Sequence, residues 1–514
     1  MPAVRPALYV FLFFQGLYAL TASGNTFRIP DEFEVYFQAE HLVDAGDLSV
    51  PQTLAMRPPI FFGKFGRDGK PYAPYGPLAA ILALPHHVAG RAIAWAAGVP
   101  RLPPPGGIPW LFLVAGLTSL AASTAAALAV AGFYRAAVAL GADARRALIL
   151  SLLLGGATCL WTYGTTFYSE AFVAAALVWA AAALLEARRT PATGSNRIAL
   201  AACLLAIAGL TKVTALVFAP GFVIGVLAHR TVTPRQRLQA AAVVAAGAGV
   251  ALALHLGWNA LRFGDPFEVG YNWAETIPVA PFRPFAIEDL PRGLAVLLLS
   301  PGKSLLLWAP ALALALVRFR RLWQTERGLA AGLLASLAIS LVFYGMYLFP
   351  EGGYAHGPRH LVPLVPLLLL PAASPAAPAP SRRSVVVGGA IGATLALLSV
   401  SVSYLEDQAI GPARGGAAAT AYYELIEPAP GRAQNRYVLS YVPFRRALGT
   451  PNWAGRNRLG LGPDYFPYHL EMLRRGAGGD VIPSWLPGVL PVPFVVLLLF
   501  GARGLALRLK PEPF

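Results

Sequence analysis

The feature that most constrains this chain is a series of apolar segments, each about twenty residues long and several without any charged residue. A helix of that length crosses the hydrocarbon core of a bilayer, which is roughly 30 Å thick. Only 13% of the 514 residues are charged, about half the fraction typical of a soluble domain, and the mean hydropathy is +0.56. These features exclude a disordered chain and an ordinary soluble enzyme. They predict an all-α transmembrane protein.

The sequence predicts about twelve membrane-spanning helices. Residues 198–228 are interrupted at Gly209 and Lys212 and carry arginines at both flanks, so we expect two short helices that turn at Lys212. Residues 75–98 carry Pro85, His86, His87 and Arg91 within an apolar segment, which favours a juxtamembrane helix on the outer surface. The first span could also be read as a secretory signal, but we expect it to remain uncleaved. The other expected spans are residues 7–23, 108–133, 148–164, 167–186, 238–260, 293–317, 328–349, 359–377, 384–404 and 486–507.

The net charge of +16 needs no nucleic-acid partner to explain it. In the twelve-span topology, Lys and Arg dominate the cytoplasmic segments, whereas almost all Asp and Glu lie in outer segments, as the positive-inside rule requires. This topology places both termini in the cytoplasm. The richness in Ala, Arg, Pro and Gly suggests a bacterium with a GC-rich genome, so the expected location is the inner membrane. The two cysteines, Cys159 and Cys203, lie in apolar segments and indicate no disulfide framework.

Four outer segments are longer than simple connections: residues 25–107, 261–292, 350–358 and 406–485. Long ordered loops usually carry function. We therefore expect a membrane domain over residues 1–405 with an outward-facing loop region, and an extracytoplasmic segment over residues 406–485. Residues 486–514 would form the last transmembrane helix and a cytoplasmic tail.

Three outer carboxylates are candidates for acid–base chemistry. Asp31 and Glu32 follow the first span directly, and adjacent acids titrate as a coupled pair. Glu170 lies at the outer end of the span that begins near residue 167. All three also fit the first turn of a helix, where a carboxylate complements the helix dipole. The spacing alone leaves both interpretations open.

Basic and aromatic residues near these acids are candidates for binding a phosphate or a sugar. Residues 63–77 are rich in Gly and Pro and carry Arg67, Lys70, Tyr72 and Tyr75. This segment could instead be an interfacial loop that contacts anionic lipid. Its glycines do not form a nucleotide-binding loop, because the Walker spacing is absent.

Two later segments add further cations. Lys303 follows a Ser-Pro-Gly turn, and His356, Arg359 and His360 follow Glu351 within a segment bent by Gly and Pro. Such residues at a span entrance are often interfacial anchors, but together they also suit an anionic ligand. No sulfur ligand and no His-x-x-x-His pair on a helix supports a zinc site, so we assign no metal ligand. No cofactor is assigned, and a divalent metal requirement stays open.

The order of these motifs resembles the GT-C superfamily of membrane glycosyltransferases, in particular protein O-mannosyltransferases and lipid A aminoarabinose transferases. The resemblance covers residues 1–375. It rests on the acidic pair after the first span, on Tyr168-Ser169-Glu170, and on three further segments: Gly69 to Pro77, Gly209 to Lys212, and Gly357 to His360. The long segment 406–485, with basic Arg432, Arg436, Arg445 and Arg446, departs from the pattern and leaves the acceptor in doubt.

The resemblance implies transfer of a sugar from a polyprenyl-phosphate donor to an acceptor at the outer face. By that likeness Asp31 would be the base, with Glu32 beside it, and Glu170 would help to place a substrate. Lys70, Lys212 and Arg359 would bind the donor phosphate. The expected partners are the lipid-linked sugar, membrane lipid and an extracytoplasmic glycan, lipid or protein.

Two other functions compete with this hypothesis. A transporter or flippase of a lipid-linked saccharide would also bind such a lipid, but the sequence shows neither an inverted repeat nor an acid in the middle of a span. A non-catalytic scaffold of the cell envelope would leave the outer acids far apart. Clustering of Asp31, Glu170 and Lys212 around one site therefore favours the enzyme.

Overall fold

We describe the fold from a computed structural model of the chain. The structure describes residues 4–22, 24, 30–55, 62–102, 108–189, 194–229, 233–271, 284–300, 303–350, 352, 355, 357–374, 381–394, 466, 470, 474 and 481–509. The predicted segment 406–485 lies almost entirely outside these residues.

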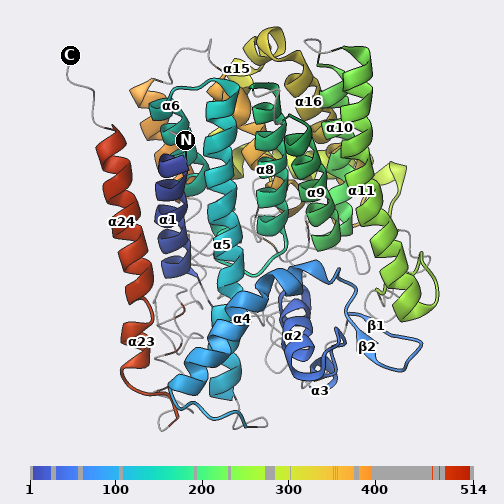
Figure 1. Ribbon diagram of the computed structural model, residues 1–514, viewed down its shortest axis with the longest axis vertical. Coiled ribbons are helices and arrows are strands. Elements are labelled where there is room, and N and C mark those ends of the chain that lie inside the picture. Colours follow the sequence, from blue (N-terminus) through green and yellow to red (C-terminus); the bar gives the residue numbers. More distant parts are fainter. Residues whose placement is uncertain are drawn as a thin grey trace.

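Most of the described chain is a bundle of apolar helices that run roughly along one direction (Figure 1). α8 packs between α5 and α9, α9 packs against α11, and α1 packs against both α5 and α24. α10 packs against α16 and α11. The bounds of these helices are α1 (Val4–Thr21), α5 (Ile108–Leu140), α8 (Glu170–Arg189), α9 (Gly194–Thr211), α10 (Ala219–Leu227), α11 (Pro234–Phe263), α16 (Arg327–Gly345) and α24 (Val492–Leu509).

Within the described residues, seven helices are long and apolar enough to cross a membrane. This result supports the predicted all-α transmembrane class, but it does not confirm the number of twelve spans. The seven include a continuous pair, α23 (Leu486–Val489) with α24, and α4 (Leu78–Ala96), which lies within the segment predicted as a juxtamembrane helix. α4 runs obliquely at one end of the bundle in Figure 1, near α2 (Pro30–Ala45).

Several predicted spans are broken helices, and proline explains part of the difference. The predicted span 293–317 contains α13 (Leu290–Leu299), α14 (Leu305–Trp308) and the start of α15 (Leu312–Thr325), and Pro310 lies between the last two. The predicted span 359–377 is a run of short turns: η4 (Arg359–Leu364), α17 (Val365–Leu368) and η5 (Leu370–Ala373). Proline lacks the N–H that a helix interior needs, so three prolines in this run prevent one long α-helix. The predicted span 148–164 likewise forms α6 (Ala144–Gly156) and α7 (Leu160–Gly164).

The predicted reversal at Lys212 is confirmed. α9 ends at Thr211, Lys212 has extended backbone angles of φ −150° and ψ 113°, and η2 (Val213–Phe218) leads into α10. The two ends of this helix pair that are remote from the turn lie at the same end of the bundle, because Gly194 lies against Ala187 of α8 and Gly225 lies against Gly328 of α16. Lys212 therefore lies at the opposite end.

Small residues allow α10 and α16 to approach closely. A Cβ atom at Gly221 would lie 2.6 Å from the carbonyl oxygen of Gly332, and one at Gly328 would lie 2.6 Å from that of Gly225. Both distances are too short for any side chain. This is the small-residue packing that brings membrane helices into contact without a hydrophobic driving force.

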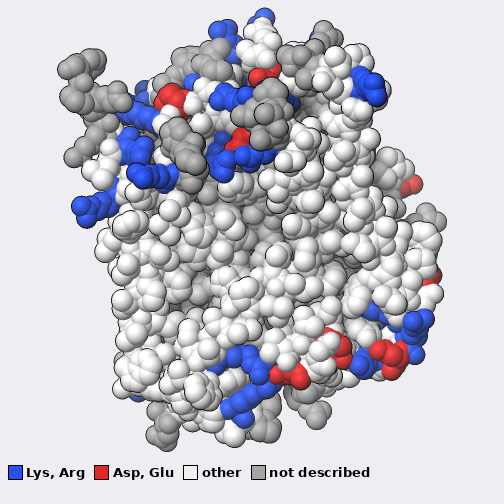
Figure 2. Space-filling model, viewed as in Figure 1, with Lys and Arg blue, Asp and Glu red and all other residues white. Residues whose placement is uncertain are grey.

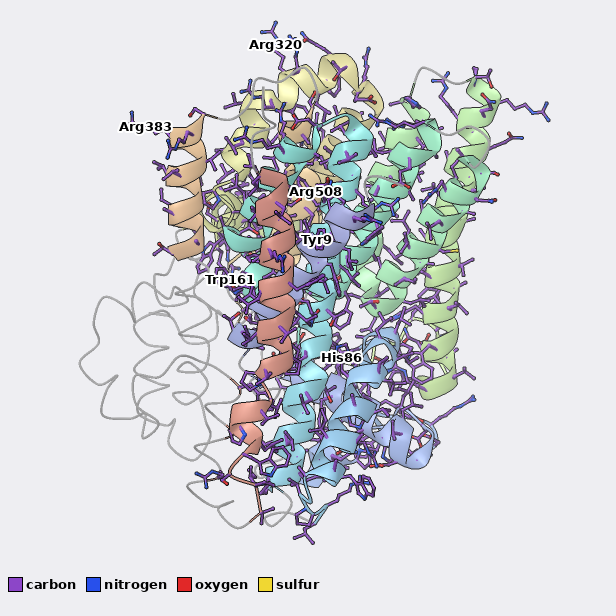
Figure 3. The ribbon with its side chains drawn as sticks, turned by 60° about the vertical axis from the view of Figure 1, so that its left-hand side comes forward. Tyr9, His86, Trp161, Arg320, Arg383 and Arg508 are labelled. Carbon is purple, nitrogen blue, oxygen red and sulfur yellow. The ribbon has the colours of Figure 1, made fainter. Side chains whose placement is uncertain are left out.

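The charged side chains gather at the two ends of the bundle. Figure 2 shows a broad uncharged band between them on the face in view. Arg320 and Arg383 project from one end in Figure 3, and Arg508 lies in the last turn of α24, toward that same end. The opposite end holds α2, the short α3 (Gln52–Ala55) and a two-stranded hairpin, β1 (Lys64–Phe65) paired with β2 (Pro71–Tyr72).

Candidate active site

The candidate site lies where α2, α8, the turn at Lys212 and η4 meet. Pro30 occupies the first position of α2, where its missing N–H costs nothing, and Asp31 and Glu32 follow in the first turn. The Asp31 side chain is 29% exposed, whereas Glu32 is completely buried. The adjacent acids therefore have different surroundings.

Arg359 connects two acids that come from different helices. Its Nε atom donates to Oε1 of Glu170 over 2.7 Å, and its Nη2 atom donates to Oδ1 of Asp31 over 2.5 Å. The guanidinium is 8% exposed and lies 4.5 Å from the centre of the Tyr168 ring. A planar guanidinium suits this geometry because its donors are fixed in a fork and its face stacks on an aromatic ring.

Lys212 completes the cluster. Its Nζ atom donates to the same Oε1 atom of Glu170 over 2.5 Å. Glu170 is 1% exposed and begins α8, where the helix dipole also favours a negative charge. The structure thus brings together Asp31, Glu170, Lys212 and Arg359, which we name the bridged cluster. Asp31, Glu170 and Lys212, whose clustering would favour an enzyme, thus lie together, and Arg359 contacts both acids; the roles of these residues stay predictions.

The backbone before Arg359 is shaped to hold it inward. Gly352 has a positive φ of 78°, its carbonyl oxygen accepts from Arg359 Nη1 over 3.4 Å, and a Cβ atom there would lie 2.8 Å from Arg359 Cβ. Lys303 is buried and its Nζ atom donates to the carbonyl oxygen of Ala355. Lys303, predicted to bind substrate, therefore supports the segment that carries Arg359.

Glu32 supports the site from the other side. Its Oε1 atom accepts from the backbone N–H of Phe167 over 2.8 Å. This bond ties α2 to the residues just before α8, which include Tyr168. The contact is consistent with a positioning role for Glu32, whose predicted part in the chemistry stays a prediction.

Two tyrosines lie close enough to Asp31 to sense its charge. Burial raises the pKa of both Tyr75 and Tyr271 well above the ordinary value, and the charge of Asp31 raises it further. Their rings meet edge to face with centres 6.2 Å apart. Both hydroxyls are therefore neutral at physiological pH. Tyr75 was predicted as a substrate-binding residue, whereas no sequence signal indicates Tyr271.

The other residues predicted from the 63–77 segment form a separate cluster on the hairpin. Lys70 Nζ donates to Asp47 over 2.8 Å, and Tyr72 donates its hydroxyl to Asp68 over 2.8 Å. The backbone N–H of Arg67 donates to the carbonyl oxygen of Arg262 in α11. Among the described contacts, none joins Lys70, Arg67 or Tyr72 to the bridged cluster, so the expected grouping of Lys70 with Lys212 and Arg359 is not seen.

Charge pairing fixes the ionisation of the hairpin cluster. Burial of the Asp47 carboxylate disfavours its charged form, but hydrogen bonds from Lys70 and Ser49 outweigh this effect and lower the pKa of Asp47 to about 2. Burial and the bond to Asp68 raise the pKa of Tyr72 to about 12. Arg262 lies over Trp258 and Phe263 and donates to the carbonyl oxygen of Ala73, which pins the hairpin to α11.

Three residues near the site were not predicted as site residues. Tyr168 lies under Arg359, Tyr271 lies near Asp31, and Glu34 is a buried acid on α2. Tyr168 belongs to a motif noted in the sequence, and Glu34 is one helical turn from Asp31, so spacing could have indicated both. His356, predicted to bind substrate, lies outside the described residues. Within the described residues, no group of three or more His, Cys, Asp or Glu side chains could hold a metal ion.

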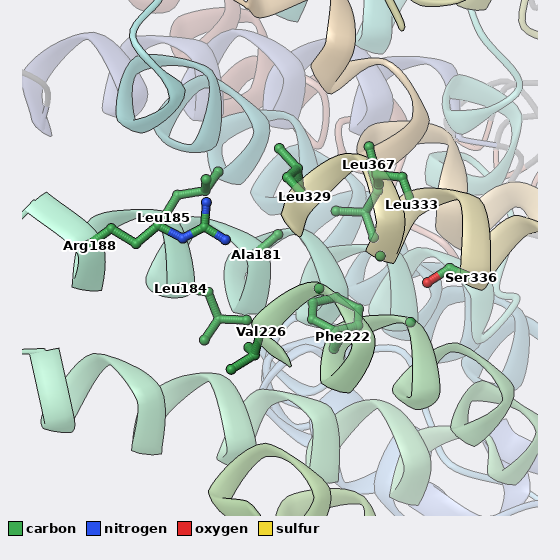
Figure 4. Close-up of a pocket in the computed structure, with 13 residues that line it drawn as sticks. Ala181, Leu184, Leu185, Arg188, Phe222, Val226, Leu329, Leu333, Ser336 and Leu367 are labelled. Atoms are coloured by element: carbon green, nitrogen blue, oxygen red, sulfur yellow. The ribbon is translucent and has the colours of Figure 1, made fainter. Parts of the chain in front are cut away.

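The close-up in Figure 4 shows an apolar cavity that is separate from this site. It has a volume of about 40 Å³ and lies between α8, α10 and α16, with Arg188 and Ser336 as its polar lining residues. Arg188 is eighteen residues beyond Glu170 on α8, about 27 Å along a helix that rises 1.5 Å per residue. A cavity of this size holds a few water molecules at most, so it is not a sugar site.

Comparison with known proteins finds no matching family model and no matching curated protein. Solved structures with a similar fold include ArnT from Cupriavidus metallidurans in the apo state, with a TM-score of 0.43 and 16% identity over 96% of this chain and 75% of that chain. A second ArnT structure, bound to undecaprenyl phosphate, has a TM-score of 0.41 and 14% identity over 96% of this chain and 77% of that chain. The archaeal oligosaccharyltransferase AglB from Archaeoglobus fulgidus, in complex with an inhibitory peptide and a dolichol-phosphate, has a TM-score of 0.45 and 12% identity.

The AglB match covers 84% of this chain, which spans 60% of the length of AglB. The likenesses to ArnT and AglB concern the fold alone. At TM-scores below 0.5 and identities of 12–16%, no residue role is carried over from them.

Proposed function

We propose that this protein is an integral membrane glycosyltransferase that moves a sugar from a polyprenyl-phosphate donor to an acceptor on the outer side of the membrane. The observation that carries the proposal is the bridged cluster. It holds two acids and two cations in direct contact, at one end of an apolar bundle. This combination provides both a proton acceptor and a site for a phosphate.

Asp31 is the proposed general base. It is the more exposed of the two acids in the cluster, and the bond to Arg359 fixes its orientation. In the reaction, the acceptor O–H bond breaks and its proton passes to Asp31. The acceptor oxygen forms a bond to the anomeric carbon of the sugar. The bond between that carbon and the phosphate oxygen breaks, and the polyprenyl phosphate leaves with the electron pair.

Lys212 and Arg359 are the proposed ligands of the departing phosphate. An ammonium group has three donors, and among the described contacts Lys212 uses one, to Glu170. The side chain is 22% exposed, so its remaining donors can reach a ligand. Glu170 then serves as the fixed negative charge that keeps both cations in place when no donor is bound.

Tyr75 and Tyr271 are the proposed hydrogen-bond partners of the sugar or the acceptor. Both carry neutral hydroxyls near Asp31. An aromatic ring with a hydroxyl can stack on a sugar face and donate to a sugar oxygen at the same time.

The proposed sidedness follows from the charge distribution. The end opposite the cluster carries Arg320, Arg383 and Arg508 and also the two described chain ends (Figures 1 and 3). By the positive-inside rule that end faces the cytoplasm. The termini would then be cytoplasmic and the active site extracytoplasmic, with the protein in the inner membrane.

The test is a transfer assay with the purified full chain in proteoliposomes. A panel of polyprenyl-phosphate sugars is offered with envelope glycans, lipids and peptides as acceptors, chosen by mass spectrometry of envelope components from cells that lack the protein. We expect free polyprenyl phosphate and a glycosylated acceptor in equal amounts. Movement of an intact lipid-linked sugar across the bilayer, with no cleavage of the sugar–phosphate bond, would instead identify a flippase.

A further inference from the structure

The helix that carries Asp31 holds a second acid close to the site. Glu34 is three residues after Asp31 on α2, so the two side chains share one face of the helix. Glu34 is completely buried. Its Oε1 atom accepts from the backbone N–H of Phe62 over 2.9 Å, and its Oε2 atom has no hydrogen-bond partner among the described residues.

The surroundings of Glu34 differ from those of the other acids near the site. Asp31 is paired with Arg359, and Glu170 with both Arg359 and Lys212. No cation is paired with Glu34 in the described part of the chain. A carboxylate buried without a cation is strongly disfavoured, whereas a neutral carboxyl with one hydrogen bond is not.

We propose that Glu34 is a positioning residue of the active site that works in its uncharged form, so that Asp31 remains the one charged group of α2 that engages Arg359. The proposal rests on the proposed transferase function. An ionised Glu34 would place a second negative charge on the same face of α2 as Asp31, whose own charge already disfavours it. It would also repel the phosphate of the donor.

The electrostatics support this proposal. Burial raises the pKa of Glu34 well above its ordinary value, the Phe62 N–H lowers it, and the charge of Asp31 raises it again. The other titratable groups that face it are Tyr75 and Tyr271, which are neutral at physiological pH. Glu34 is therefore uncharged and supports catalysis below its raised pKa. It becomes anionic, and the reaction slows, as the pH rises above that value.

The experiment compares three variants of the full chain in proteoliposomes over a range of pH. Glu34→Gln keeps the size and the neutral charge, and its amide oxygen can still accept from Phe62. We expect its kcat/KM at neutral pH to stay within about threefold of wild type, and the fall in activity at alkaline pH to move upward by at least about one pH unit. Glu34→Ala should lose at least about tenfold at every pH.

The matched control is Glu40→Gln. Glu40 is another buried acid on α2, but it accepts from both Tyr36 and Gln52 and has no described contact with the bridged cluster. Its replacement should leave the alkaline fall in activity where it is in wild type. A loss of activity in Glu34→Gln equal to that in Glu34→Ala, with an unchanged pH profile, would overturn the proposal, because the charged form would then be the active one.

A second measurement does not depend on transfer. The infrared spectrum of the purified protein at neutral pH should contain the carbonyl stretch of a protonated carboxyl group that is lost in Glu34→Gln. Absence of that difference overturns the uncharged state directly. If the infrared band is present but wild type transfers no sugar from any donor, the transferase proposal fails while the protonation of Glu34 stands.

Discussion

The guanidinium of Arg359 donates to the carboxylate of Asp31 over 2.5 Å, although 328 residues separate them in the chain. The same side chain also reaches Glu170, so one residue ties η4 to α2 and α8. Long-range charged contacts of this kind are costly to bury and costly to break. Their presence at one end of an otherwise apolar bundle is what distinguishes this end as the site.

Asp31→Asn should abolish sugar transfer without loss of folding. The amide keeps the shape of the side chain but cannot take a proton, and a general base contributes about 10²–10⁴ in rate. The measurement is kcat for transfer in proteoliposomes, with membrane insertion checked by protease protection. Asp47→Asn is the matched control, because Asp47 is paired with Lys70 on the hairpin. Equal activity of Asp31→Asn and wild type would exclude Asp31 as the base.

Removal of Arg359 should destabilise the protein through the acids it leaves behind. In Arg359→Gln, Glu170 retains Lys212 but Asp31 loses its described cation, and breaking a buried pair costs about 3–5 kcal/mol. We expect a clear fall in the apparent Tm in detergent. The double variant Arg359→Gln with Asp31→Asn should recover part of that fall, because the acid that loses its described cation is then also neutral. Strictly additive effects of the two changes would contradict the coupling.

Lys212→Ala should weaken use of the donor more than use of the acceptor. The ammonium of Lys212 donates one described hydrogen bond, to Glu170, and has further donors for a phosphate. Loss of this phosphate contact should weaken binding of the lipid-linked sugar. The expected result is a rise of about tenfold or more in KM for the donor, with a smaller change for the acceptor. Lys70→Ala is the control, since Lys70 pairs with Asp47 on the exposed hairpin. A similar rise in both variants would indicate a general electrostatic effect.

The sequence predicts the local features of this molecule better than its long-range contacts. The apolar segments and the basic flanks suffice to place the reversal at Lys212, because hydropathy and charge act locally. The predicted span 293–317 is not one helix; Pro310 separates α14 from α15, but the apolar content of the segment gives no sign of this interruption. Lys70 was grouped with Lys212 by motif order, but the hairpin turns it toward Asp47.

The bridged cluster was predictable as a set of residue types and not as a geometry. A recognisable motif contains each of the four residues Asp31, Glu170, Lys212 and Arg359. No sequence pattern indicates, however, that Arg359 contacts both acids. Tyr271 carries no sequence signal, since its place near Asp31 depends on how the end of α11 packs. Contacts between residues hundreds of positions apart are set by packing of the whole bundle.

The hairpin should loosen at acidic pH because of Asp47. Its pKa in the folded protein is about 2, below the ordinary value of 3.8, so its ionised form is favoured by folding. A lowered pKa contributes stability that is complete above pH 3.8 and is lost as the pH falls toward 2. Hydrogen exchange of residues 64–72 should therefore accelerate over this interval, relative to α5 in the same sample. In Lys70→Met the bond from Lys70 to Asp47 is absent, so the acceleration should shrink. If wild type and Lys70→Met show the same pH dependence, the pair does not hold the hairpin.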